Sequence, residues 1–209
     1  MKQKARAVLT ADIVNSSLLS KGQWNSLLKS FEKVFRSRDI LFDFFRGDSF
    51  YALCDAQLAL RVICLLRTLA LGASKGKGDK EVDVRAAIGI GKVEANIKDL
   101  GTAKGEAFIL SGREMDRMGK EGPRLSIRCT NDKADAGLAV VALFSDYLLR
   151  KMTVKQSQVI HELLLGATQV ETAKKLQKSQ STVNKHAHAA DWNELAMVLK
   201  IYEKLVIQI

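Results

Sequence analysis

Apolar residues change their spacing several times along the first 150 residues, and each change marks the end of one predicted element. Runs typical of strands occupy residues 5–13, 41–46, 49–54, 82–93 and 125–129. Apolar residues at helical spacing occupy residues 23–35, 56–71, 105–118 and 134–149. The order β-α-β-β-α-β-α-β is typical of a ferredoxin-like α+β sandwich. We therefore expect helices on one face of a mostly antiparallel sheet.

Glycines mark several connections in this part of the chain. Gly47 and Asp48 separate two aromatic runs and predict a tight hairpin turn. Residues 74–80 (SKGKGDK) predict a polar loop. Gly89 and Gly91 do not belong to a G-x-G-x-x-G motif, so no dinucleotide site is implied. They instead predict a close backbone approach or a bulge within a strand.

The pattern becomes entirely helical after residue 151. We expect an α+β domain at 1–130, a linker helix at 131–151 and a helical domain at 152–209. Within the last domain, Thr153 with Gln156, and Thr168 with Glu171, have the spacing of capping boxes that begin helices.

A further helix is predicted to begin after the N-cap Ser179. Its inward positions are Val183, Ala187 and Ala190. Its outward positions are polar and are Gln180, Ser181, Asn184, Lys185 and His188. A short polar face on a helix held by small residues suits the major groove, so we expect double-stranded DNA as a partner.

The segments MTVKQSQVIHELLLGATQVETAKKL and SQSTVNKH resemble the helix-turn-helix of LuxR/GerE-type regulators and of sigma-factor region 4. The resemblance covers about 50 residues. It implies that Ser181, Thr182, Asn184 and Lys185 lie at the DNA. The chain departs from these families because no arginine follows Arg150. A purely structural or protein-binding helix-turn-helix is the alternative interpretation.

A seam of large apolar residues ends the chain. Its members, at steps of three and four, are Trp192, Leu195, Leu199, Tyr202 and Val206. Two heptads of this kind either close the helical domain or form a two-fold homodimer, as many helix-turn-helix proteins do.

Charge and cysteine content narrow the class of protein. The net charge of +10 fits a nucleic-acid binder, but residues 152–209 hold only seven lysines against five acidic residues. Three scattered cysteines without metal-ligand spacing predict buried free thiols in a reducing cytoplasm. The sequence contains no run of about 18 apolar residues, so we expect no membrane span.

Two acidic residues of the α+β domain are candidates for binding a cation. Asp12 ends the first predicted strand, and Asp48 lies in the hairpin turn. If the two positions meet at one rim of the sheet, their carboxylates suit Mg²⁺ and a nucleotide phosphate. In the alternative interpretation Asp12 caps a turn and Asp48 supplies hairpin geometry. Arg46, beside the hairpin, is a candidate phosphate contact.

Four separated blocks, TADIVNS, FRGDSF, VRAAIGIG and GEAFILSGREMDRM, resemble the bacterial SatD family in the same order over most of residues 5–130. More distantly they are similar to class III nucleotidyl cyclases. The resemblance implies that Asp12 and Asp48 match the metal-binding aspartates and that Arg113 matches the arginine that stabilises the transferring phosphate.

The departures from the cyclase pattern concern the nucleotide. The position of the base-recognising lysine is Phe44, and the position of the ribose-orienting asparagine is Ile109. The second base-recognising position is Thr102. Phe44 and Ile109 cannot form hydrogen bonds with a base or a sugar, and cyclisation requires the ribose to be held in line.

We therefore expect a DNA-binding regulator whose cyclase-like domain senses a nucleotide or phosphorylated ligand, dimerises, or does both. Coupling between the two parts of about 1–3 kcal/mol would be typical. The alternative is a divergent metal-dependent nucleotidyl cyclase or another phosphoryl-transfer enzyme.

Overall fold

The computed structural model describes residues 5–209 except 46, 75–80, 95–96, 98 and 120–121. The described strands are β1 (Arg6–Val14), β2 (Leu41–Phe45), β3 (Ser49–Asp55), β4 (Asp83–Gly91) and β5 (Leu125–Cys129). They form one sheet in the order β2-β3-β1-β4-β5. All neighbouring strands are antiparallel except β4 and β5, which are parallel. The predicted hairpin is confirmed, and Gly47 takes the positive φ of 81° that its turn requires.

The helices of the α+β part are α1 (Lys21–Arg36), α2 (Ala59–Ala73), α3 (Glu106–Met118) and α4 (Asp132–Arg150). Short 3₁₀ turns at Ser16–Leu18 and Ala56–Leu58 precede α1 and α2. Each predicted helix and strand is present, with ends that differ from the prediction by a few residues. The predicted loop at 74–80 falls almost entirely outside the described residues.

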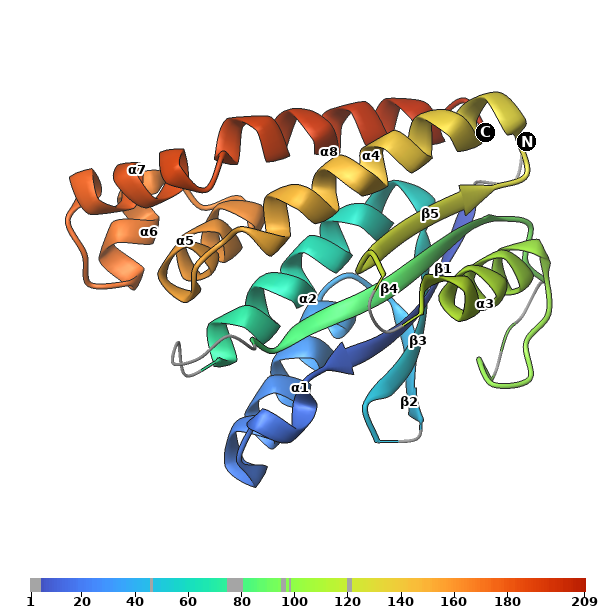
Figure 1. Ribbon diagram of the computed structural model, residues 1–209, viewed down its shortest axis with the longest axis horizontal. Coiled ribbons are helices and arrows are strands. Elements are labelled where there is room, and N and C mark those ends of the chain that lie inside the picture. Colours follow the sequence, from blue (N-terminus) through green and yellow to red (C-terminus); the bar gives the residue numbers. More distant parts are fainter. Residues whose placement is uncertain (1–4, 46, 75–80, 95–96, 98, 120–121) are drawn as a thin grey trace.

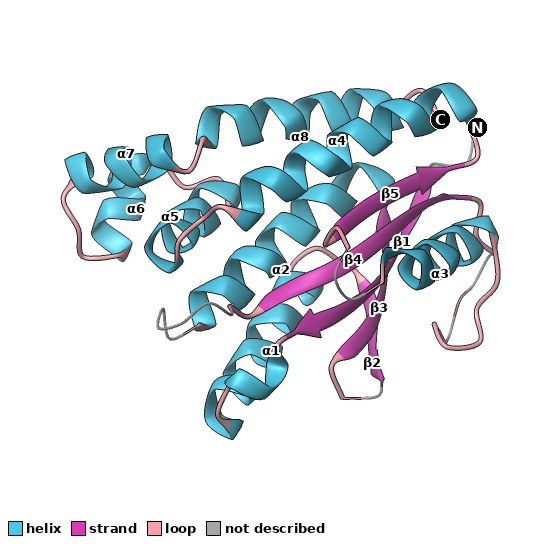
Figure 2. Ribbon diagram, viewed as in Figure 1, coloured by secondary structure: helices cyan, strands magenta, loops and turns pink. Residues whose placement is uncertain are grey.

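The expectation that helices cover one face of the sheet was wrong. Leu9 and other odd-numbered residues of β1 pack in the main core with α1 and α2. Val8 instead packs with Ala107 of α3 in a separate cluster. The hydroxyl of Thr10 donates to Ser111 Oγ of α3 at 2.9 Å. Helix α3 therefore covers the opposite face, as Figures 1 and 2 show.

Gly89 explains how α3 lies so close to the sheet. A Cβ added at Gly89 would collide with the backbone oxygen of Ala107 and would lie 2.6 Å from the backbone nitrogen of Ser111. Only a residue without a side chain permits this distance between strand and helix. The prediction of a close backbone approach at Gly89 is confirmed.

The C-terminal part contains α5 (Val154–Leu164), α6 (Gln169–Lys175), α7 (Gln180–Ala189) and α8 (Trp192–Val206). The predicted capping boxes at Thr153 and Thr168 are both formed, and Ser179 accepts a hydrogen bond from the backbone of Thr182. Gly166 follows α5 with a φ of 94°, as expected of the residue that ends a helix.

These four helices share a core with the rest of the chain. Ile160 of α5 and Leu199 of α8 belong to the same buried cluster as Ile63 of α2. Helix α8 runs beside α4, and α5 lies against α2 (Figure 1). The hydroxyl of Tyr202, fully buried, donates to the carbonyl of Ala56 at 2.7 Å. This hydrogen bond fixes α8 against the 3₁₀ turn that precedes α2.

The seam of α8 is used inside the chain. Leu195, Leu199, Tyr202 and Val206 are all buried, whereas Trp192 is half-buried. Of the two alternatives for these residues, the structure shows that they close the helical part onto the rest of the chain.

By length and composition, residues 56–73 could also cross a membrane. However, 67% of this stretch is buried within the protein, where it forms the central helix of the core. Burial among the sheet and the C-terminal helices accounts for its apolar character.

Candidate functional site

The carboxylate of Asp12 is held by an arginine. Asp12 lies on β1 directly opposite Arg85 of β4. Arg85 Nε donates to Asp12 Oδ1 at 3.2 Å, and its Nη2 forms an ion pair with Oδ2. A third nitrogen of the same guanidinium donates to the carbonyl of Gly119, just beyond α3. Both Asp12 and Arg85 side chains are largely buried, so this pairing neutralises Asp12 within the structure.

Asp48 immediately precedes Ser49, the residue of β3 that pairs with Asp12. The backbone nitrogen of Ile13 donates to the carbonyl of Asp48 at 2.9 Å, which joins the end of β1 to the hairpin turn. The Asp48 carboxylate accepts a hydrogen bond of 3.4 Å from Ser16 Oγ. The structure therefore brings the two predicted metal-binding residues to one rim of the sheet, with different partners.

As arranged, these residues do not fit a resident divalent cation. Both oxygens of Asp12 are occupied by Arg85. Among the described residues, no group of three or more histidine, cysteine or carboxylate side chains is placed to hold a metal ion. Binding of Mg²⁺ by oxygen ligands would first require the guanidinium to leave Asp12.

Two further residues of the predicted phosphate and nucleotide site, Arg113 and Phe44, have surroundings of their own in the structure. Arg113 is exposed on α3 and has no hydrogen bond or ion pair with any described side chain. Arg46 lies outside the described residues. Phe44 packs against Phe35 and Phe50. Phe44 thus lies on the face of the sheet that α1 covers, opposite the face of Asp12.

Helix α7 presents the predicted polar face to solvent. The exposed residues are Gln180, Ser181, Asn184, Lys185 and His188, and Thr182 is half-buried. Val183 and Ala187 on the other side of the helix are buried, and Ala190 beyond its end is fully buried. The buried and exposed positions of this helix agree with the sequence prediction.

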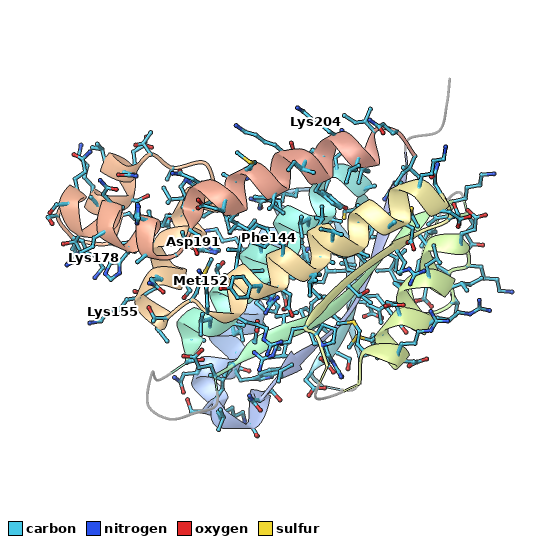
Figure 3. The ribbon with its side chains drawn as sticks, turned by 45° about the horizontal axis from the view of Figure 1, so that its top comes forward. Phe144, Met152, Lys155, Lys178, Asp191 and Lys204 are labelled. Carbon is cyan, nitrogen blue, oxygen red and sulfur yellow. The ribbon has the colours of Figure 1, made fainter. Side chains whose placement is uncertain are left out.

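A tight turn sets α7 against α6. Gln177 takes a positive φ of 52°, and the backbone nitrogen of Lys178 donates to the carbonyl of Ala173 at 2.9 Å. Lys178 lies at the end of the molecule that α6 and α7 form, whereas Lys204 of α8 lies far from it (Figure 3). Lys185 of α7 and Lys174 of α6 are exposed, whereas Lys175 of α6 pairs with Glu162 at 2.7 Å.

The three cysteines are free and buried, as predicted. Burial raises the pKa of Cys54 to about 12, and it raises the pKa of Cys64 to about 12 as well. A thiol that stays protonated is a poor nucleophile and metal ligand. These side chains therefore serve as small apolar groups in the core.

Sequence reasoning missed a buried ionic network. Arg67 of α2 donates to both oxygens of Asp83, at 2.9 and 2.7 Å, and to Asp146 of α4 at 2.7 Å. Arg124 also pairs with Asp83 at 2.7 Å. The local sequence around each residue gives no sign of this network, because its members come from separate elements. Sequence reasoning also missed Arg85, because its position opposite Asp12 depends on how β1 pairs with β4.

No protein-family model matches the sequence, and no curated protein sequence matches it. Several solved structures are similar over part of the chain. A bacterial light-regulated adenylyl cyclase matches with a TM-score of 0.42 and 13% identity, covering 59% of this chain and 75% of that chain. The GGEEF domain of a diguanylate cyclase from Vibrio cholerae matches with a TM-score of 0.41 and 12% identity. The match covers 61% of this chain and 84% of that domain's chain. A guanylyl cyclase matches with a TM-score of 0.39 and 17% identity, covering 59% and 74%.

Proposed function

We propose that this chain is a DNA-binding regulatory protein that acts in the cytoplasm. In this proposal residues 152–209 are a helix-turn-helix unit, and α7 enters the major groove of double-stranded DNA. The observation that carries it is the division of α7 into two faces. Val183 and Ala187 are buried and hold α7 against the core, whereas the polar side chains on its other face are exposed and can contact base edges.

The side chains of α7 suit direct contacts with bases. Gln180 and Asn184 carry amides that pair with adenine, and Lys185 suits guanine or a phosphate. Ser181, Thr182 and His188 complete the proposed DNA surface. Lys174 and Lys178 flank it and are placed for backbone phosphates.

The α+β part acts in this proposal as a sensing and dimerising domain, in line with its resemblance to SatD proteins and to nucleotidyl cyclases. Its catalytic pattern is degenerate, because Asp12 is paired with Arg85 and Phe44 is part of the core. A nucleotide or phosphorylated ligand would have Arg113 and Arg46 as phosphate contacts.

The surface for dimerisation is an apolar stripe that α4 and α8 share. On α4 it consists of Val140, Leu143, Phe144 and Tyr147, and on α8 of Met197 and Ile201. Leu143 is 68% exposed and Met197 64% exposed. Large contiguous apolar patches are rare on monomeric proteins.

The α4 and α8 parts of this stripe lie side by side along the two helices. Gly137 lies against Leu205, and Lys151 forms an ion pair with Asp191 at the other end of α4. Because α4 and α8 are therefore antiparallel, Met197 and Ile201 lie beside the middle of α4. Figure 3 shows this face with Phe144 labelled. A second copy with the same stripe would form an isologous interface.

Sedimentation equilibrium across protein concentration tests the dimer. We expect the wild type to be a dimer and Leu143→Glu to be a monomer, because a charge in the apolar stripe would be buried without a partner. Ile109→Glu is the matched control, since Ile109 is also exposed on a helix but lies on α3. A monomeric wild type, or a dimeric Leu143→Glu, would argue against this surface.

Selection from a library of random duplexes tests DNA binding. The full chain is incubated with the library, with and without ATP or GTP, and bound duplexes are recovered by electrophoretic shift over successive rounds. We expect one sequence motif to be enriched, and the double variant Gln180→Ala, Asn184→Ala to lose that enrichment. No enrichment in any condition would refute the proposal.

A second candidate is a metal-dependent phosphoryl-transfer enzyme. The hydrogen bond between Ile13 and Asp48 supports it, because it joins the hairpin turn to the end of β1, but Arg85 would have to release Asp12 before a metal ion could bind. Incubation with each nucleoside triphosphate and Mg²⁺ or Mn²⁺, followed by chromatography, tests this alternative. Turnover that Asp48→Asn abolishes would support it, whereas intact triphosphates would dismiss it.

A further inference from the structure

A groove of about 740 Å³ lies where the α+β part meets the C-terminal helices. Its walls come from α1, α2 and α5, and Leu176 at the end of α6 closes one side. Volumes between about 300 and 1,000 Å³ are typical of small-molecule sites. No residue of this groove belongs to the rim that holds Asp12 and Asp48, so it is a separate candidate site.

Three of the five α1 residues that line the groove are small. Gly22, Ser26 and Ser30 follow each other at steps of four, so they lie in one row on the helix. Across from them, Gly72 and Ala73 of α2 also leave the space open. A Cβ added at Gly22 would meet nothing within 4 Å. The groove is therefore a consequence of small side chains on two helices.

The polar centre of the groove is His161 of α5. Its Nδ1 lies 3.0 Å from Thr68 Oγ1, and that hydroxyl lies 2.9 Å from the carbonyls of both Cys64 and Leu65. In the tautomer that carries its proton on Nδ1, the imidazole donates to this hydroxyl, whose own proton points to a carbonyl, and the backbone of Leu65 is a further hydrogen-bond partner of His161. This assignment leaves Nε2 with an acceptor lone pair, for which the described part of the chain supplies no partner.

Charge in the groove is balanced. Glu162 is the acidic residue among its described lining residues, and Lys175 pairs with it at 2.7 Å. No lysine or arginine lines the groove in the part of the chain that the structure describes. A phosphate or carboxylate ligand would find no cation among the lining residues to compensate its desolvation, because Lys175 and Arg38 act on His161 from outside the lining. A cationic ligand would find Glu162 already paired.

The groove combines apolar surface with hydrogen-bonding groups. Leu27, Leu69 and Leu176 offer apolar surface, while Gln158 offers an amide beside the imidazole of His161. A ligand amide could donate its N–H to Nε2 and accept from Gln158, with its ring against the leucines.

We propose that this groove binds an uncharged aromatic or heteroaromatic molecule that carries an amide-like donor and acceptor. The bound molecule contacts α1 and α2 on one side and α5 and the end of α6 on the other. Since α6 leads directly into α7, binding adjusts the position of the proposed DNA surface. That regulatory consequence rests on the proposed function, whereas ligand binding itself does not.

Three compounds of one shape and different charge test the proposal. Benzamide is neutral, benzoate is anionic and benzamidine is cationic at neutral pH. Each is titrated into the full chain, with the imidazole signals of His161 followed by NMR. We expect saturable binding of benzamide and at least about tenfold weaker binding of benzoate and benzamidine, which corresponds to about 1.4 kcal/mol.

Variants of α1 locate the binding. Ser26→Trp fills the groove and is expected to abolish benzamide binding, whereas Asn25→Trp, one position along and outside the lining, retains it. Gly22→Leu is a second filling variant, which the open space at Gly22 accommodates. Absence of saturable benzamide binding, equal binding of all three compounds, or retention by both filling variants would overturn the proposal. These results do not depend on DNA, so they separate this proposal from the failure of DNA binding.

Discussion

Arg67 is a fully buried guanidinium, and its charge is compensated entirely by neighbouring side chains. Asp83 and Asp146 accept hydrogen bonds from it, so α2, β4 and α4 are joined at one point. Burial alone would raise the pKa of Asp83, but ion pairing and hydrogen bonding with Arg67, together with Arg124, hold it below its ordinary value. The network therefore stays charged, and its contribution depends on every member.

Arg67→Ala should lower the free energy of unfolding by about 3–5 kcal/mol, because it removes the guanidinium that two buried carboxylates share and leaves Asp83 with Arg124 as its remaining ion-pair partner. Urea denaturation followed by circular dichroism measures this change. Arg36→Ala is the control, since Arg36 is exposed and pairs with Glu32 only at 3.9 Å. For Arg36→Ala the expected loss in the free energy of unfolding is below about 1 kcal/mol. Equal losses for the two variants would show that the buried network contributes little.

His161 predicts a pH dependence of stability. Burial lowers its pKa, the neighbouring charge of Glu162 opposes this shift, and Lys175 and Arg38 add to it. A histidine whose pKa is lower in the folded protein stabilises it above the pKa of the unfolded chain, about 6.5, and this contribution is lost as pH falls below that value.

Urea denaturation at pH values on either side of about 6.5 tests this dependence. We expect the wild type to lose stability at the acidic pH. His161→Gln should lose less over the same interval, because its side chain does not titrate. Parallel losses in the two proteins would assign the acid sensitivity to other groups.

At the level of elements, sequence patterns predicted most helix starts but not the positions of helices in space. The capping boxes at Thr153 and Thr168 were predictable because each depends on residues three positions apart. The face of the sheet that α3 covers was not predictable, since it depends on how β4 pairs with β5. The pairing of Asp12 with Arg85 was missed because it depends on how β1 pairs with β4, and 73 residues separate the two side chains in sequence.

The packing of α3 on β4 gives a prediction for Gly89. Gly89→Ala should destabilise the protein by about 1–3 kcal/mol or more, because the added methyl group meets backbone atoms of α3 that cannot rotate away. Thermal unfolding of this variant can be compared with that of Gly112→Ala, whose Cβ meets nothing within 4 Å.

The control should be neutral or stabilising by up to about 1 kcal/mol, since alanine favours a helix more than glycine does. If Gly89→Ala is as stable as the control, then α3 is not held as closely to the sheet as the structure indicates.

At the level of the whole molecule, the two parts of the chain are joined by a continuous core. Tyr202 and Ala56 form a buried hydrogen bond across 146 residues of sequence, and Arg61 reaches both Leu164 and Glu203. The groove between α1, α2 and α5 exists only because these parts meet. Its residues come from four segments, so no local pattern could have predicted it.

A shared core predicts that the two parts unfold together. The chain contains two tryptophans, Trp24 on α1 and Trp192 on α8, so each single-tryptophan variant reports on one part. Fluorescence during urea denaturation should give the same midpoint for Trp24→Phe and Trp192→Phe, apart from any effect of the substitutions on total stability measured by circular dichroism. Two separate transitions within one variant would show that the C-terminal helices unfold independently.

The central claim is that the exposed face of α7 binds double-stranded DNA. Its most direct test is the salt dependence of affinity, measured by fluorescence anisotropy with one labelled duplex between about 50 and 200 mM salt. We expect affinity to fall steeply with salt for the wild type, and Lys185→Ala to reduce the magnitude of the logarithmic slope by about 1. Lys204→Ala, at the far end of α8, should keep the wild-type slope. Absence of binding to the duplex, or the same slope for all three proteins, would contradict the claim.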